Sequence, residues 1–135
     1  MTFEVTQRVL FRHCDPAGIV FYPRYFEMIN DMLERFFDEV IGAPWQDMHP
    51  EAGVPTAEIS ARFAAPSRHG DELVLRLNVL RIGRTSMGYS MAASSQEELR
   101  FEATGTLVLI NSVGKPTPWP VEMRGKLEAQ KELAA

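Results

Sequence analysis

Residues 13–26 read HCDPAGIVFYPRYF and join a turn to the start of a helix. The Asp-Pro-Ala-Gly segment at residues 15–18 is typical of a turn, because Pro fixes one backbone angle and Gly accepts conformations that other residues avoid. Pro23 suits the first turn of a helix, where its missing N–H group would have no partner in any case. The stretch therefore predicts a carboxylate, a turn and a helix N-terminus close together.

The helix that follows has one apolar face. Residues at helical spacing from Phe26 to Val40 form this face, and Gly42 and Pro44 predict where the helix ends. A helix of about 18 residues is about 27 Å long, which makes it the central element of so small a chain. The apolar residues are Phe26, Ile29, Leu33, Phe36, Phe37 and Val40.

Residues on both sides of the helix alternate with the period of a β-strand. Residues 3–11 alternate before the helix, with Phe3, Val5, Val9 and Phe11 on one face. After Pro55 the same period returns and predicts strands, with a loop at 66–70, a bend at 82–84 and a hairpin loop at 96–98. The later strands centre on residues 59–63, 73–79, 87–93 and 100–110.

The element order predicts the fold class. One strand, one long helix and about four antiparallel strands make an α+β domain, residues 1–135, with a sheet of about five strands wrapped around the helix. The apolar run at 107–110 suggests burial on both faces, and the chain has no spare helix for the second layer, so we expect a partner subunit there. The polar tail from about residue 125 is expected to fray.

Composition excludes several classes of partner. The chain has 135 residues and a net charge of −4, so it lacks the basic field that nucleic acid requires. No apolar run reaches the ~18 residues that a membrane span needs, and the N-terminus does not read as a signal peptide. A single cysteine, Cys14, excludes an internal disulfide. We expect a cytoplasmic protein that binds neither nucleic acid nor membrane.

Two other site chemistries are poorly supported by the residues. His13 and Cys14 are adjacent and would point to opposite faces of an extended segment, which argues against a catalytic dyad, and Cys14 is expected to be a small buried residue. His13, Asp15, His49 and His69 lack the spacing of metal ligands on a helix. We therefore expect no metal.

The sequence resembles the hotdog-fold acyl-CoA thioesterases, in particular the 4-hydroxybenzoyl-CoA thioesterase type. The likeness is strongest in the run Cys14–Val20 followed by Tyr22-Pro23 and Tyr25, and it continues to about residue 110. It implies the hotdog fold and a homodimer in which two sheets join. It also implies a further pairing into a homotetramer and a site between subunits. Further similarities are Pro44-Trp45, Gly53, Pro55, Phe63, Asp71, Leu73, Arg84 and Ser86.

The resemblance also implies roles for individual residues. Asp15 matches the catalytic carboxylate, and Tyr22 matches the residue whose backbone N–H binds the thioester carbonyl oxygen. We expect Val20, Asn30 and Trp45 to contact the acyl group, with Asn30 in place of an acidic helix residue. We expect Arg81, Arg84 and Lys115 to meet the phosphates of coenzyme A, which is part of the substrate, so no cofactor is expected.

The chemistry of thioester hydrolysis suits these residues. It requires a carboxylate that attacks or activates water, a donor for the developing oxyanion and an apolar wall such as Ile19-Val20-Phe21. The residues leave open whether Asp15 attacks the thioester or activates water. An isolated Asp-Pro would favour a turn residue, but Tyr22-Pro23 and the long helix at the matching distance favour the catalytic role. An aromatic or short acyl group fits best.

Two other functions remain alternatives: a hotdog enoyl-CoA hydratase, and a module that binds an acyl thioester without turnover. Thr85 stands after Arg84 where a second cation would be expected, and this thinner basic cluster is the reason for considering the binding module.

Overall fold

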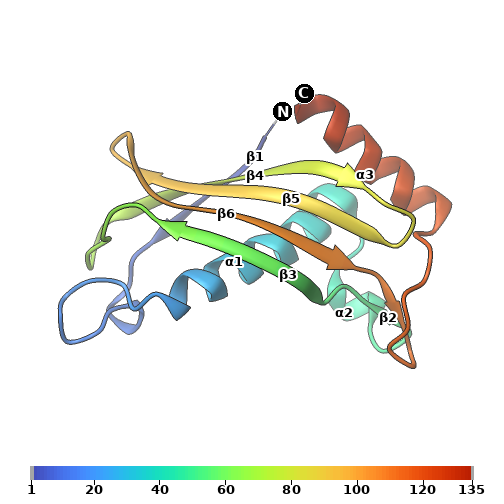
Figure 1. Cartoon of the computed structure of the whole chain (residues 1–135), viewed down its shortest axis with the longest axis horizontal. Helices are drawn as coiled ribbons and strands as arrows, with labels where there is room; N and C mark the ends of the chain where they lie inside the picture. The colour runs from blue at the N-terminus through green and yellow to red at the C-terminus, as the bar shows by residue number, and fades with distance from the viewer. Residues whose placement is uncertain (1, 135) are drawn as a thin grey trace.

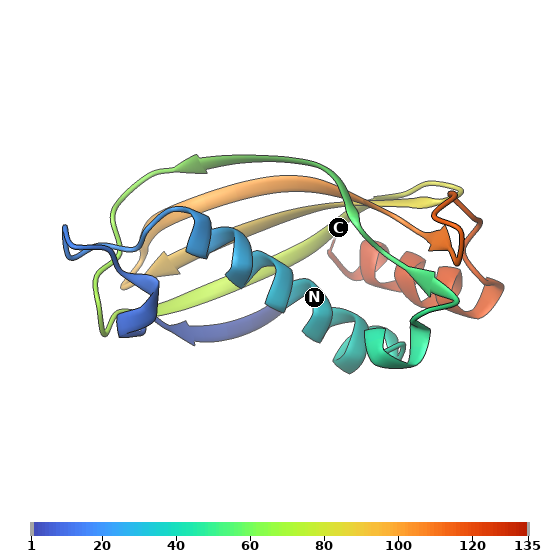
Figure 2. The same cartoon turned by 90° about the horizontal axis from the view of Figure 1, so that it is seen from below.

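The computed structural model describes residues 2–134. A five-stranded antiparallel sheet curves around the helix α1, Pro23–Phe36, which lies across its concave face (Figures 1 and 2). The strand order is β1-β4-β5-β6-β3, and this confirms the α+β class and the sheet wrapped around one long helix. The strands are β1 (Phe3–Arg8), β3 (Thr56–Phe63), β4 (Glu72–Ile82), β5 (Ser86–Ser95) and β6 (Glu98–Val108).

Shorter elements connect these parts. A 3₁₀ turn, Phe11–His13, leads from β1 into the loop before α1, and a π turn, Phe37–Ile41, extends α1. The helix α2, Trp45–Met48, and the pair of short strands β2 (Ala52–Gly53) and β7 (Ile110–Asn111) lie beyond that π turn. The C-terminal helix α3 spans Val121–Ala134.

Helix α1 begins and ends as its sequence predicts. It begins at Pro23, and the helical segment stops at Gly42, whose φ of +73° is a conformation that glycine adopts without strain. The buried face points at the sheet, so the apolar periodicity becomes the core of the molecule. That face consists of Tyr25, Met28, Ile29, Met32, Leu33, Phe36 and Phe37.

The sheet supplies the other half of the core. Inward and outward residues alternate along β4, β5 and β6, and Met91 pairs with Leu77 on one side and Ala103 on the other. The prediction for Phe11 is wrong: its side chain is 80% exposed, because the chain leaves β1 after Arg8 and turns. The inward residues include Leu73, Leu75, Leu77, Val79, Met87, Tyr89, Met91, Ala93, Phe101, Ala103 and Leu107.

The C-terminal helix corrects two expectations. The tail that was expected to fray belongs to α3 as far as Ala134, and Leu127 is completely buried. The chain also has a second helix for its sheet, since α3 packs against β4 beside the π turn, on the same side as α1 (Figure 2). The apolar run at 107–110 is not buried on both faces, because Leu107 and Leu109 are buried while Val108 and Ile110 are half-exposed.

Candidate functional site

Asp15 begins a tight turn and uses one carboxylate oxygen within it. Its Oδ1 accepts the Ala17 N–H at 2.9 Å, and its backbone carbonyl accepts the Gly18 N–H at 2.9 Å. Gly18 has a φ of +82°, which this turn requires. Asp15 is half-buried, and its second oxygen has no hydrogen-bond partner among residues 2–134. The turn reading and the catalytic reading of Asp15 are therefore compatible.

Val20 and Ser67 anchor this turn to the rest of the domain. The Val20 N–H donates to the Ser67 carbonyl at 2.9 Å, and Cys14 pairs with Val20 across the base of the turn. The buried Ser67 hydroxyl accepts the Tyr25 hydroxyl at 2.9 Å. Val20 is only 6% exposed, so it lies behind the turn and fixes it. Its expected contact with the acyl group stays a prediction.

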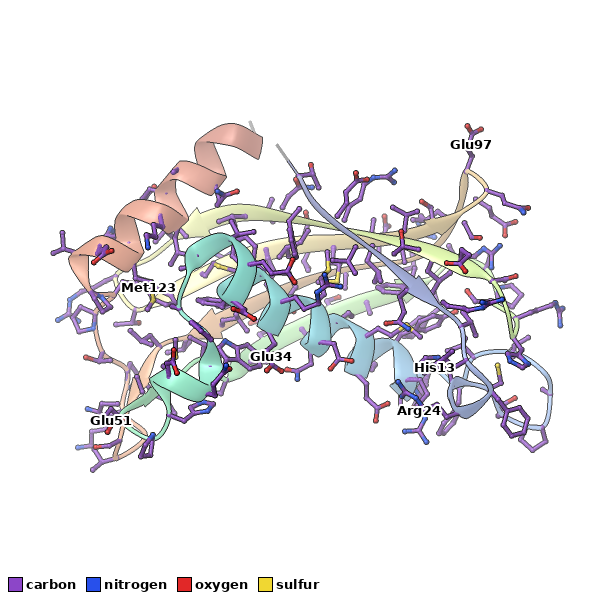
Figure 3. The ribbon with its side chains drawn as sticks, turned by 180° about the vertical axis from the view of Figure 1, so that it is seen from behind. His13, Arg24, Glu34, Glu51, Glu97 and Met123 are labelled. Carbon is purple, nitrogen blue, oxygen red and sulfur yellow. The ribbon has the colours of Figure 1, made fainter. Side chains whose placement is uncertain are left out.

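His13 is a structural residue of the same loop, at the end of the molecule where α1 starts (Figure 3). Its ring is buried, and its Nδ1 accepts the Leu10 N–H at 2.8 Å. Burial lowers the pKa of His13, and the neighbouring Arg12 lowers it further. The thiol of Cys14, which is half-buried, faces the Leu10 carbonyl at 3.8 Å and not the imidazole. The two residues form no dyad.

A free backbone donor lies at the start of α1. Tyr22 is the residue before Pro23, and its N–H has no partner within the described chain. The carbonyls of Phe21 and Tyr22 accept the N–H groups of Arg24 and Tyr25. Because the positive end of the helix dipole coincides with this N–H, the position favours a partial negative charge.

Aromatic rings surround this donor. Tyr22 is 52% exposed and contacts Phe21 and Phe63, with ring centroids 5.7 Å and 5.9 Å away. Phe63, at the end of β3, also stacks on Tyr25 and meets the edge of Phe26. Such a wall excludes water once a ligand or a second chain covers it.

Asn30 and Trp45, the two residues expected to contact the acyl group, lie together in a cavity that neither Asp15 nor Tyr22 lines. Both line a cavity of about 450 Å³ between α1, α2, β2 and β7. The Trp45 Nε1 is buried without a hydrogen-bond partner in the described chain. Asn30 is exposed and also lines a smaller hollow of about 290 Å³ between α1 and β3. Other residues that line the larger cavity include His49, Pro50, Ala52, Gly53, Val54 and Thr56.

One chain does not bring this cavity to Asp15. Figure 3 shows His13 and Arg24 at one end of the long axis and Glu51, next to β2, at the other. The 14 residues of α1 span about 21 Å, and Asn30 lies half-way along them, so the cavity extends from the middle of the helix toward the end away from Asp15.

The three expected coenzyme A residues divide between two surfaces. Arg84 is exposed in the turn between β4 and β5, and its side chain pairs with no carboxylate of the described chain. Lys115 is exposed in the loop that follows β7. The Leu109 N–H donates to the Thr85 carbonyl and the Leu109 carbonyl accepts the Thr117 N–H, so this loop and the β4–β5 turn are adjacent. Arg81 instead lies on the outer face of the sheet, where its Nη2 donates to Thr106 at 2.8 Å.

A second anchor of the loop, Asp71, could not be assigned from the sequence. It accepts the Arg68 N–H at 2.9 Å and pairs with Arg100 at 2.7 Å. These bonds lower the pKa of its carboxyl group. They hold residues 66–71, and so Ser67, against β6. The sequence showed Asp71 only as one of the similarities to the thioesterase family, with no role attached to it.

Comparison with known proteins places the chain in a family. Residues 9–127 match the family model described as the thioesterase-like superfamily. The chain belongs to this superfamily. Over 77 residues, 55% of each chain, it is 31% identical to the 4-hydroxybenzoyl-CoA thioesterase of Pseudomonas sp. (strain CBS-3). The matched part thus spans about half the length of that curated relative.

Solved structures extend the similarity to the whole fold. A 1,4-dihydroxy-2-naphthoyl-CoA thioesterase from Synechocystis superposes with a TM-score of 0.85 at 21% identity, over 94% of this chain and 96% of that one. A gentisyl-coenzyme A thioesterase gives a TM-score of 0.85 at 25% identity, over 93% and 99% of the two chains. The expected hotdog fold is confirmed.

Among the side chains described for residues 2–131, no three His, Cys, Asp or Glu side chains gather where a metal ion would bind. None of the helices described is long and apolar enough to cross a membrane.

Proposed function

We propose that this superfamily member is an acyl-CoA thioesterase that hydrolyses the thioester of coenzyme A with an aromatic acyl group. The observation that carries the proposal is the free Tyr22 N–H at the start of α1, on the same loop as the Asp15 carboxylate. A donor and a carboxylate in this relation are what acyl transfer needs. The names of the relatives support the same class of substrate.

The reaction assigns one task to each group. The Tyr22 N–H binds the carbonyl oxygen, which becomes negative as the carbonyl carbon turns tetrahedral. Asp15 either removes a proton from the attacking water or attacks the carbon itself and forms an anhydride that water then opens. In both routes the C–S bond breaks, the coenzyme A sulfur leaves as thiolate and takes up a proton, and the carboxylic acid is released.

The separation of the two ends of α1 supports a site shared between two copies. Strand β3 is at the edge of the sheet, and its inward residues Ile59 and Phe63 are 36% and 44% exposed. A two-fold axis beside this edge would pair β3 with its copy in antiparallel fashion. Opposite ends of the two helices would then be neighbours, with Asp15 of one copy near the Asn30 and Trp45 cavity of the other. This arrangement supports the expected homodimer, and both the homodimer and the homotetramer remain predictions.

The lining of the cavities favours a ring with polar substituents. The names of three relatives specify hydroxybenzoyl, dihydroxynaphthoyl and gentisyl groups. In this chain the Asn30 amide both donates and accepts hydrogen bonds, and the buried Trp45 Nε1 donates, so either group suits a ring hydroxyl. Apolar neighbours such as Ile29 and Leu33 suit the ring itself.

A thiol-release assay tests the proposal. The purified protein is given benzoyl-, 4-hydroxybenzoyl-, phenylacetyl- and butyryl-CoA, and free thiol is measured over time. We expect kcat/KM to be highest for a hydroxylated aromatic thioester. Calorimetric binding of these thioesters without thiol release would contradict the enzyme and support a binding module. Hydration of crotonyl-CoA without thiol release would support a hydratase.

A further inference from the structure

Hydrogen bonds from several parts of the chain hold the backbone of the turn between β4 and β5. Each of its four carbonyls, at residues 83–86, accepts a hydrogen bond. The Thr85 carbonyl accepts the Leu109 N–H at 2.7 Å, and the Ser86 carbonyl accepts the Gly83 N–H at 2.9 Å. The remaining bonds come from the C-terminal part of the chain.

Two residues near the start of α3 make those remaining bonds. Trp119 donates its N–H to the Arg84 carbonyl at 3.3 Å and its Nε1 to the Ser86 carbonyl at 3.0 Å. Arg124 donates its Nη1 to the Gly83 carbonyl at 2.9 Å. An exposed turn is usually bonded to water at such carbonyls, so these contacts restrict its backbone.

The two residues are themselves fixed. The Trp119 ring is 5% exposed and stacks on Phe37 with centroids 6.5 Å apart. Leu127, one turn beyond Arg124, is completely buried, and α3 packs along β4. Figure 3 shows Met123, in the first turn of α3, at the same end of the molecule as Glu51. The donors that bond to the turn are therefore held in place by residues packed in the core.

The turn presents one free cation. Arg84 is exposed, and its guanidinium pairs with no carboxylate among the side chains described for residues 2–131, whereas Arg124 is paired with Glu128 at 3.3 Å. We propose that Trp119 and Arg124 are positioning residues that hold the Arg84 backbone so that its side chain meets the nucleotide phosphates of coenzyme A. This rests on the proposed function. A fixed backbone lowers the conformational entropy that the turn loses when the phosphates bind.

Kinetics with two thioesters separate this role from general stability. Pantetheine carries the thiol arm of coenzyme A and lacks the nucleotide phosphates that Arg84 would bind. We measure kcat and KM for 4-hydroxybenzoyl-CoA and for 4-hydroxybenzoyl-pantetheine. Arg84→Met is expected to raise KM for the CoA thioester about tenfold, and Arg124→Met about fivefold, with kcat unchanged. The KM for the pantetheine thioester stays the same in both variants.

A double variant shows whether Arg124 acts through Arg84. In Arg84→Met, the added change Arg124→Met is expected to raise KM no further, because the turn then has no cation to place. Arg124→Lys retains a donor for the Gly83 carbonyl and is expected to restore most of the KM. Arg76→Met is the control. It removes a surface arginine of β4 that pairs with Glu4 of β1 and lies about 23 Å along the chain from Gly83, and it is expected to leave KM unchanged.

Two results would overturn the inference. One is a KM that rises equally for both thioesters in Arg124→Met, which would show a general loss of structure. The other is full additivity of the two changes, which would place Arg124 itself on the phosphates. Failure of the proposed function is distinct from both, since the wild-type protein would then release no thiol from either thioester.

Discussion

The Tyr25 hydroxyl donates a 2.9 Å hydrogen bond to the Ser67 hydroxyl, and both side chains are buried. This contact joins the first turn of α1 to the loop whose Ser67 carbonyl also holds Val20. It therefore connects the two groups proposed to act on the substrate, the Tyr22 N–H and the Asp15 carboxylate.

Loss of the Ser67 hydroxyl should weaken the domain and the site together. Ser67→Ala leaves the Tyr25 hydroxyl buried without a partner, which is expected to lower the free energy of unfolding by about 1–3 kcal/mol. Urea denaturation measures this. Tyr25→Phe is expected to cost a similar amount, and the double variant less than the sum of the two. Strict additivity would show that the two hydroxyls do not interact.

Asp15→Asn tests the carboxylate without removing the turn. The asparagine amide oxygen still accepts the Ala17 N–H, so the thermal unfolding midpoint should stay within about 2 °C of the wild type. Thiol release from the best CoA thioester should fall by about 10²–10⁴-fold, since both proposed routes need the ionised oxygen. Wild-type turnover in this variant would remove Asp15 from the mechanism.

A mixing experiment tests whether two copies share the site. Asn30→Trp fills the cavity that Asn30 lines, and Asp15→Asn inactivates the loop, so each homodimer should be inactive. A mixed dimer would retain one intact site, and random mixing should restore about a quarter of wild-type activity. Co-expression with two affinity tags supplies the mixed dimer. No recovery in that dimer would mean that each chain holds both groups of its own site.

Alkaline pH should destabilise the protein through Tyr89. Its hydroxyl is buried without a partner among residues 2–134, and burial raises its pKa to about 12. An unfolded tyrosine ionises near pH 10, so above that pH the unfolded chain loses a proton that the folded chain keeps. The free energy of unfolding should fall between about pH 10 and 12, by at most about 3 kcal/mol from this residue.

Tyr89→Phe identifies this contribution. The variant removes the unpartnered hydroxyl and should be as stable as the wild type or more stable at pH 7. Its loss of stability above pH 10 should be smaller than that of the wild type, with chemical denaturation at each pH as the measurement. Parallel pH profiles for the two proteins would assign the alkaline sensitivity to other groups. Tyr25 is the first of these groups, because burial raises its pKa as well.

Much of the fold could be predicted because its signals are local. Pro23 and Gly42 mark the ends of the helical segment, and period-two alternation marks the strands. The Asp15 turn and the Tyr22 N–H lie within eight positions of one another, so their nearness depends on local backbone geometry. Phe11 was misassigned because alternation continues in its sequence after the chain has left β1.

The sequence alone determined where the turn, the long helix and the strands begin, because backbone angles and side-chain periodicity depend on near neighbours. The tertiary structure decided that α3 packs on β4, that Ser67 and Asp71 hold the loop, and that Asn30 and Trp45 share a cavity far from Asp15. Those relations join residues distant in the chain. Their energy comes from burial and hydrogen bonds that exist only after the sheet has closed around α1.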